Sequence, residues 1–526
     1  MLALRIHPAP GWGNRPAHRR RCRAGILCCV IGGFELGLPA TLGLVGATLL
    51  LAVVAVRVST RIGLPSLLLY LGIGLLLGES GLGIQFDDAA LTQQLGLTAL
   101  VLILAEGGLT TRWSDVRPGV GVGLVLSTAG VAASTAVTGG ALHWLVDLEW
   151  RTALLWGAVL SSTDAAAVFS VLRGARVPRR LAGTLELESG LNDAPAYIAV
   201  VLLASAGTVP WWSPLLGLYQ LAAGGVIGIA FGWLGSIGLR RAALPATGLY
   251  PVATISVCVV AFALAQGLGV SGLLAAFLAG LVLGNSRLPH RAGTLSFAEG
   301  LGWLSQIGLF VMLGLYASPS RLPAAILPAL VTGAVLLLLA RPVSVLVSAA
   351  PFRVPWREQV FLSWSGLRGA VPVVLALVAV SQGADGGQRL VEVVLVLVVV
   401  LTVLQGSTLS AVARWLRLSD PAGPAEIEVD AAPLEQIGAD LLQLRVPTGS
   451  KLHGVYLSDL RLPRGATTSL VVRDGAGFTP QPSTRLQEGD GLLVVTTTEQ
   501  RAATERRIRA VHRAGRLARW LGETGR

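Results

Sequence analysis

Several ionisable side chains lie inside apolar stretches that are long enough to cross a lipid bilayer. These residues are Glu106, Asp164, Glu186, Glu188, Asp193, Arg341 and Arg368. Inserting one such charge costs at least about 2.5–3.5 kcal/mol, so a charged residue within a membrane span is by default a functional-site candidate. The sequence therefore predicts chemistry that takes place within a membrane.

The stretch LELESGLNDAPAY (185–197) places a hydroxyl and a carboxylate on one face of a helix. Ser189 precedes Asp193 by four residues, so both side chains point to the same side. Hard oxygen atoms of this kind suit a monovalent cation, while burial favours a neutral, protonated carboxyl group. A group that holds either a proton or a cation exchanges the two by competition. The alternative is a buried ion pair without a transport role.

The same stretch contains two further acids with different expected roles. Glu186 lies near the cytoplasmic end of the span and is expected at the membrane interface. Glu188 lies on another side of the helix, and we expect a structural ion pair with Arg368 because a lone buried arginine is prohibitive.

Two spans contain residues that interrupt helices. Gly157 and the stretch SSTD (161–164) lie within one, and SWSGLRGAVP (363–372) lies within the other. Transporters built from inverted repeats place interrupted helices at corresponding positions of their two halves, with the ion site between them. Alternatively, the small residues only allow close helix packing, although packing does not explain Asp164 or Arg368.

These residues require a polytopic membrane protein to position them. The chain has 526 residues, of which 53% are hydrophobic and 13% charged, with a mean hydropathy of +0.68. Soluble proteins carry about 25% charged residues. We predict an all-α fold of about thirteen transmembrane helices, with inverted repeats and broken crossing helices. The expected spans are 38–56, 63–78, 94–111, 119–142, 152–172, 186–206, 214–239, 249–267, 270–285, 300–317, 324–350, 359–381 and 389–413.

Arginines follow every odd-numbered span, whereas the loops after the second, fourth, sixth and twelfth spans are acidic or neutral. The positive-inside rule then predicts a cytoplasmic C-terminus. The net charge of +12 therefore reflects topology, and nucleic-acid binding is not expected. Residues 1–37 break the pattern with five arginines between positions 15 and 23, and we interpret them as a basic extension, either a signal segment or residues absent from the mature protein.

A small soluble domain is expected after the last span. Residues 38–418 form the transmembrane domain, 419–433 a Pro- and Ala-rich linker, and 434–500 an α+β domain with alternating runs such as GLLVVTT. Residues 501–526 are predicted as a basic tail with a partly amphipathic helix, either solvated or on the membrane surface.

Three motifs resemble those of the NhaP-type antiporters in the monovalent cation:proton antiporter-1 family. They are SSTDAAAVF (161–169), ESGLNDAPAY (188–197) and SGLRGAVP (365–372), and LILAEGGL (102–109) is similar to the acidic motif of that family's third span. The resemblance covers roughly residues 40–415. It implies a homodimer, each protomer having a dimerisation part and a six-helix core.

The resemblance also assigns roles to residues. It implies that Asp193, preceded by Asn192, is the exchanging carboxylate, that Thr163, Asp164 and Ser189 complete the site, and that Glu188 pairs with Arg368. Glu106 belongs to the third-span motif, and an Asn-Asp pair implies electroneutral one-for-one exchange. The sequence departs from the family where Ala194 and Pro195 follow Asp193 and where Ala105 precedes Glu106.

Residues 441–495 resemble the TrkA-C domain of potassium-conductance regulators, through the RDG motif, Pro480 and the EGDGLLVV strand. No G-x-G-x-x-G motif follows a strand here, so no companion nucleotide-binding domain is expected. The combination resembles the potassium/proton branch of the family. The domain is expected to sense a small ligand or ion, or to dimerise.

Potassium/proton antiport in the cytoplasmic (inner) membrane is therefore the leading hypothesis, with sodium as the near alternative. A ligand-gated cation channel is a hypothesis of another class, although no filter sequence such as TVGYG is present. An enzyme is not expected, because the six histidines form no catalytic cluster, and neither a metal nor a cofactor is predicted.

Overall fold

The computed structural model describes most of the chain. The residues outside the description are 1–29, 32–33, 36, 63–64, 80, 85–87, 165–176, 206, 208, 419–428, 435–438, 498, 519, 521–522 and 524–526. Most of the predicted N-terminal extension, with Cys22, Cys28 and Cys29, lies outside the described residues, as does the second half of the predicted fifth span. The extension contributes one described feature, the antiparallel pair β1 (Val30–Ile31) and β2 (Phe34–Glu35).

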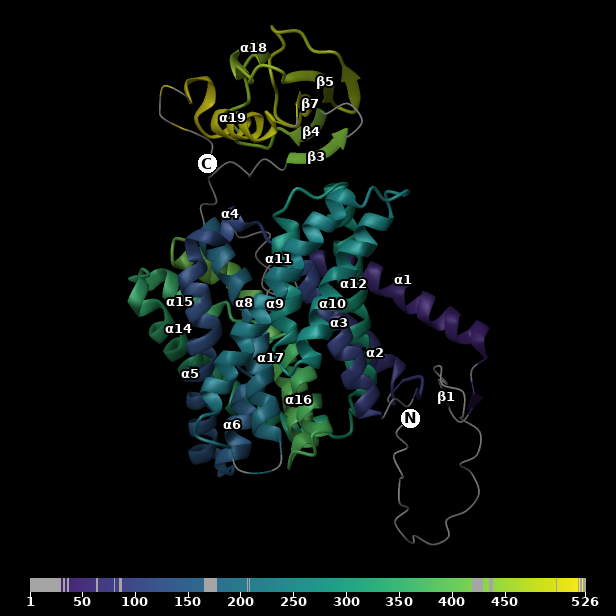
Figure 1. Cartoon of the computed structure of the whole chain (residues 1–526), viewed down its shortest axis with the longest axis vertical. Helices are drawn as coiled ribbons and strands as arrows, with labels where there is room; N and C mark the ends of the chain where they lie inside the picture. Colours follow the sequence, from purple (N-terminus) through teal and green to yellow (C-terminus); the bar gives the residue numbers. More distant parts are fainter. Residues whose placement is uncertain are drawn as a thin grey trace.

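The long apolar stretches fold into helices, which confirms the predicted all-α membrane part (Figure 1). Each of the predicted spans overlaps at least one helix. The helices are α1 (Leu38–Ile62), α2 (Ser66–Leu77), α3 (Ala89–Thr110), α4 (Trp113–Val116), α5 (Val120–Val146), α6 (Trp150–Val159), α8 (Arg179–Ala204), α9 (Ser213–Arg241), α10 (Leu249–Gly267), α11 (Gly272–Gly284), α12 (Arg291–Tyr316), α13 (Leu322–Val335), α14 (Arg341–Ala349), α15 (Trp356–Trp364), α16 (Val371–Ser381) and α17 (Gly387–Trp415).

Length and composition allow these helices to cross a bilayer. Within the described ranges, eight helical stretches are long and apolar enough to do so, and α2, α11 and α16 are shorter apolar helices. Large apolar side chains cover the outer surface, including Leu50 (71% exposed) and Leu327 (72% exposed). An apolar outer surface with its backbone polar groups paired within helices is the arrangement that lipid requires.

Two predicted spans are each made of two elements. Helix α13 continues through a π-helical turn, η2 (Leu336–Ala340), into α14. Helices α15 and α16 are separated by the non-helical residues 365–370, which confirms the predicted interruption of that span. A π-helical turn frequently accompanies a functional site, and here it directly precedes Arg341.

The C-terminal region forms a separate small domain, seen beyond one end of the helices in Figure 1. Its antiparallel five-stranded sheet has the order β3 (Val429–Leu434), β4 (Ala439–Arg445), β7 (Gly491–Thr497), β5 (Thr467–Arg473), β6 (Ala476–Phe478). Alternate residues of β4 and β7, such as Leu442 and Val494, are buried on one face. The predicted α+β domain is therefore present.

The boundaries of this domain differ from those predicted. Strand β3 begins at Val429, inside the predicted linker 419–433. Helix α19 (Arg501–Ala514) lies in the predicted tail 501–526, yet its residues Ile508 and Val511 are buried in the core of the sheet domain. The amphipathic helix expected there is present, but its apolar side packs against the sheet and does not face solvent or a membrane surface.

Candidate functional site

The two interrupted spans contact each other inside the helical part. Helix α6 ends at Val159 and residues 160–164 continue without helical structure, opposite the break 365–370. The backbone N–H of Asp164 donates a hydrogen bond to the carbonyl oxygen of Leu367 at 2.9 Å. Gly369 permits this approach, because a Cβ atom at that position would overlap the Asp164 carboxylate. The two breaks thus form one contact surface.

Helix α8 presents its polar residues to the break after α6. The Ser162 hydroxyl donates to Oδ1 of Asp193 at 2.5 Å, and Nδ2 of Asn192 donates to Oγ1 of Thr163 at 2.6 Å. Oγ1 of Thr163 and Oγ of Ser189 lie 3.2 Å apart. All five side chains are buried. The spacing of Ser189 and Asp193 on one helix face therefore places both beside the second polar segment.

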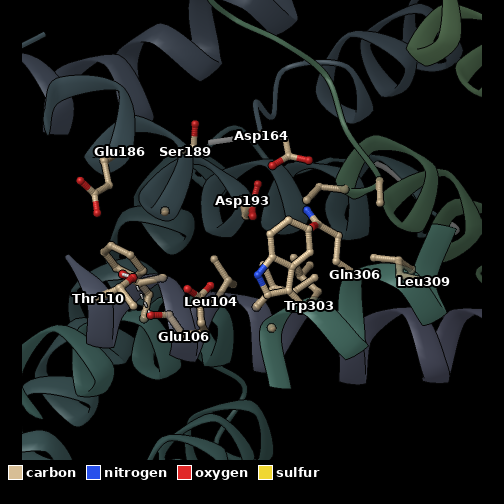
Figure 2. A pocket seen from close by; sticks show the side chains of 18 of the residues that line it. Leu104, Glu106, Thr110, Asp164, Glu186, Ser189, Asp193, Trp303, Gln306 and Leu309 are labelled. Atoms are coloured by element: carbon tan, nitrogen blue, oxygen red, sulfur yellow. Dashed lines mark hydrogen bonds between the residues drawn. The ribbon is translucent and has the colours of Figure 1, made fainter. Parts of the chain in front are cut away.

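A cavity of about 280 Å³ lies beside this cluster (Figure 2). Ser189, Asp193 and Asp164 lie on one wall, and Glu106 on α3 lies on the opposite wall. Of the residues predicted for the site, Asp193, Asp164, Thr163, Ser189 and Glu106 all line the cavity. Asn192 does not, but it fixes Thr163 through its amide.

The predicted pair between Glu188 and Arg368 is wrong. Glu188 instead forms a buried ion pair with Arg341 of α14, in which Nη2 donates to Oε2 at 2.8 Å and Nη1 donates to Oε1. Arg341 reaches this position past Gly366, where a Cβ atom would lie against its Nε. Both members are almost fully buried, so each supplies the charge that the other needs.

Arg368 has a different role from the one predicted. Its Nη1 donates to the carbonyl oxygens of Ser161 at 3.1 Å and Ser162 at 2.5 Å, and its own carbonyl oxygen accepts from the Thr402 hydroxyl at 3.2 Å. The guanidinium group thus satisfies carbonyl oxygens that the end of α6 leaves without helical partners. Arg368 stabilises the segment that holds Ser162 against Asp193.

Three further residues of the site were not among those predicted. Ser162 lies within the SSTD stretch, but helical spacing cannot identify its partner because the segment is not helical. Glu186, expected at the interface, lines the cavity and accepts a hydrogen bond from the Thr111 hydroxyl at 2.5 Å. Gln306 of α12 lines the same cavity, and only the tertiary packing of α12 reveals it.

The arrangement suits the binding of a monovalent cation. Carboxylate and hydroxyl oxygens from two chain segments converge on one cavity, and hard oxygen ligands are those that such cations take. The described residues include no group of three or more His, Cys, Asp or Glu side chains that could hold a metal ion. Asp193 can carry a cation or a proton, but not both.

Known proteins resemble the chain in both of its parts. Residues 46–415 match the family model of the transmembrane sodium/hydrogen exchanger, and residues 441–509 match that of the TrkA-C domain. The chain is 38% identical over 465 residues to the K(+)/H(+) antiporter NhaP of Alkalimonas amylolytica, with 86% of this chain and 81% of the relative covered. It is 36% identical over 464 residues to the K(+)/H(+) antiporter NhaP2 of Shewanella baltica, with 86% and 80% covered.

Sodium transporters are also among the similar proteins. The chain is 30% identical over 369 residues to the Na(+)/H(+) antiporter NhaS2 of a Synechocystis strain, with 68% of this chain and 66% of the relative covered. The solved structure of the sodium proton antiporter MjNhaP1 from Methanocaldococcus jannaschii superposes with a TM-score of 0.62 at 21% identity, covering 73% of this chain and 100% of the other. This last likeness shows a shared fold.

Proposed function

The chain belongs to the transmembrane sodium/hydrogen exchanger family, and on this premise we propose that it exchanges potassium ions for protons through Asp193. The observation that carries the proposal is the position of this carboxylate, which is 3% exposed, lines a cavity and accepts a hydrogen bond from Ser162. A carboxyl group so enclosed is neutral when protonated and needs a counter-charge when it is not. A bound cation supplies that charge.

Exchange then follows from competition at one site. In the cation-bound state, one oxygen of Asp193 contacts the ion, with Ser189, Thr163 and Asp164 contributing further oxygens from the cavity wall. Protonation removes the charge of the carboxylate and releases the ion. Because the two cargoes exclude each other, each passage of a cation in one direction accompanies a proton in the other, and the cycle is electroneutral.

Glu106 gives the cavity a second carboxylate. It lies on α3, across the cavity from Asp193, and lines the cavity together with Glu186. We assign to Glu106 the attraction of cations into the cavity, since an acidic wall concentrates cations near the site. Its removal is expected to weaken apparent cation affinity without abolishing exchange.

Potassium is the preferred cation in this proposal. The relatives named above with 38% and 36% identity are K(+)/H(+) antiporters, and the similarity covers most of their length. Sodium is the second candidate, favoured by the likeness to NhaS2. Fluorescence dequenching in everted vesicles measures the proton movement that each cation drives. Adding potassium and sodium separately distinguishes the two candidates. A potassium response at least as large as the sodium response supports the first.

The arginine pattern of the loops supports the orientation that we propose. With arginines on the cytoplasmic side, the C-terminal sheet domain lies in the cytoplasm and the protein is a multi-pass protein of the inner membrane. The match to the TrkA-C domain supports a regulatory role, through a small ligand or ion that binds there. We further propose a homodimer embedded in lipid, as the family resemblance implies.

The decisive experiment replaces Asp193 with alanine. Cation-driven proton movement in everted vesicles is expected to disappear, while the amount of protein in the membrane stays the same. Asp385→Ala is the matched control, because Asp385 is exposed in a loop away from the cavity. Normal exchange in the Asp193 variant would refute the mechanism. Cation flux that persists in Asp193→Asn without proton movement would instead favour a channel.

A further inference from the structure

A second, much smaller cavity lies behind the exchange site. Its volume is about 10 Å³, and it is lined by Leu336, Leu337, Arg341, Gly366, Arg368, Leu401 and Gln405. Five of these residues come from the π-helical turn, α14 and the break 365–370, and two come from α17. A cavity of roughly 10–15 Å³ has room for a single water molecule.

Three polar atoms from the residues around this cavity have no hydrogen-bond partner among the described protein atoms. They are Nε of Arg341, Nε of Arg368 and Oε1 of Gln405, and the three residues are 4%, 1% and 1% exposed. Other polar atoms of these side chains are engaged: Nε2 of Gln405 donates to the carbonyl oxygen of Trp364 at 2.8 Å, and both Nη atoms of Arg341 donate to Glu188. Leaving a buried donor or acceptor unpaired costs about 1–3 kcal/mol.

The chemistry of the three atoms matches one ligand. Each Nε carries one N–H donor, and Oε1 is an acceptor, so a water molecule can accept two hydrogen bonds and donate one. Buried waters typically make about three such bonds. We propose that this cavity binds one ordered water molecule, which bridges the guanidinium groups of Arg341 and Arg368 to the amide of Gln405.

The bridge gives Gln405 a positioning role. Gln405 holds the water, the water holds Arg368, and Arg368 donates to the carbonyl oxygens of Ser161 and Ser162. Ser162 in turn donates to Asp193. This role rests on the proposed exchange at Asp193, whereas the water itself depends only on the cavity and its three polar atoms.

A high-resolution structure of the full chain in lipid nanodiscs tests the water directly, whatever the protein transports. We expect one density peak within roughly 2.7–3.2 Å of all three atoms. A cavity without density, or side chains that turn to pair with one another, would overturn the proposal. A strong anomalous peak in a crystal grown with bromide would do so too, because the ligand would then be an anion.

Transport assays test the positioning role. Gln405→Met removes both the acceptor and the amide donor to Trp364 at similar size, and we expect the cation concentration for half-maximal exchange to rise at least about 3–10-fold, the effect of one weakened hydrogen bond. Gln405→Glu lacks the same donor but keeps an acceptor oxygen, so it isolates the bond to the water and is expected to restore most of the affinity. Leu404→Met, on the lipid-exposed side of the same helix, is the control. An unchanged concentration in Gln405→Met, with the water present in the native protein, would refute the role and leave the water site intact.

Discussion

The backbone N–H of Asp164 and the carbonyl oxygen of Leu367 form a hydrogen bond that joins the two interrupted spans. Neither atom belongs to a helix at this point. Because the bond uses backbone atoms, it survives any change of side chain that leaves the two segments in contact. Two nearby residues decide whether the segments stay in contact: Gly369, which has no side chain to block the approach, and Arg368, whose side chain bonds to the other segment.

Gly369→Ala is expected to abolish or severely reduce exchange. The added methyl group overlaps the carboxylate of Asp164, which must then move away from the cavity. Exchange rates in everted vesicles, normalised to membrane protein, provide the measurement. Gly140→Ala is the control, since nothing lies within 4 Å of a Cβ atom there. Equal activity of the two variants would contradict the proposed contact.

Removing one member of the Glu188–Arg341 pair should destabilise the protein strongly. Glu188→Ala leaves a buried guanidinium group without its counter-charge, at a cost of about 3–5 kcal/mol. The double variant Glu188→Leu with Arg341→Met should recover much of the loss. Thermal unfolding of the purified protein in detergent measures both.

The pair of Arg321, which is exposed, and Glu392, which is half-buried, is the comparison for this experiment, with 3.8 Å between Nη1 and Oε1. Removing it should change stability by about 0–1 kcal/mol, because the exposed Arg321 keeps its water and solvent screens the pair. A loss at Glu392 as large as that at Glu188 would argue against the special cost of the buried pair.

Ser162→Ala should weaken cation binding without removing it. The substitution deletes the hydroxyl that donates to Oδ1 of Asp193 and leaves the carboxylate itself in place. We expect a higher cation concentration for half-maximal exchange, by about 10–150-fold for a hydrogen bond to a charged group, with a maximal rate close to normal. Ser205→Ala, whose hydroxyl bonds only locally at the end of α8, is a suitable control. A selective loss of the maximal rate would instead indicate a role for Ser162 in the movement between states.

The C-terminal domain contains an acid whose protonation should control its stability. Burial raises the pKa of Asp490, but hydrogen bonds from Arg473 and from the Gln487 N–H outweigh burial, and the pKa lies below its usual 3.8. The stability that this group contributes is therefore complete above pH 3.8 and is lost as the pH falls through the lowered pKa. Hydrogen exchange in β7 of the full chain, measured against pH, should show protection lost only below pH 3.8. Asp490→Asn should weaken protection at neutral pH.

Much of the fold follows from the sequence, because apolar length and arginine placement are properties of single segments. The interruptions at Ser161–Asp164 and Ser365–Ala370 follow for the same reason, as does the shared face of Ser189 and Asp193. The partner of Glu188 does not follow. Arg341 and Arg368 are both intramembrane arginines, and only the tertiary structure, in which Arg341 reaches Glu188 past Gly366, selects one of them.

Other features depend on contacts between distant segments. The hydrogen bond from Ser162 to Asp193 depends on the position of a non-helical segment. Such a segment has no regular spacing from which the direction of a side chain could be predicted. Strand β3 lies within the predicted linker and helix α19 within the predicted tail, because the composition of a short Pro- and Ala-containing strand or a basic helix does not show what it packs against. Their positions are set by tertiary contacts: β3 pairs with β4, and Ile508 of α19 packs in the core of the sheet domain.

The position of β3 also limits how a signal can travel. Leu418 follows the last helix and Val429 opens the sheet, so eleven residue steps separate the two. A fully extended chain of that length spans at most about 40 Å. The sheet domain is thus tethered within this distance of the end of α17. On the same helix, Thr402 donates to the carbonyl oxygen of Arg368 in the break and Gln405 donates to that of Trp364 at the end of α15. A single helix therefore connects the tether of the sheet domain to the interrupted span beside the exchange site.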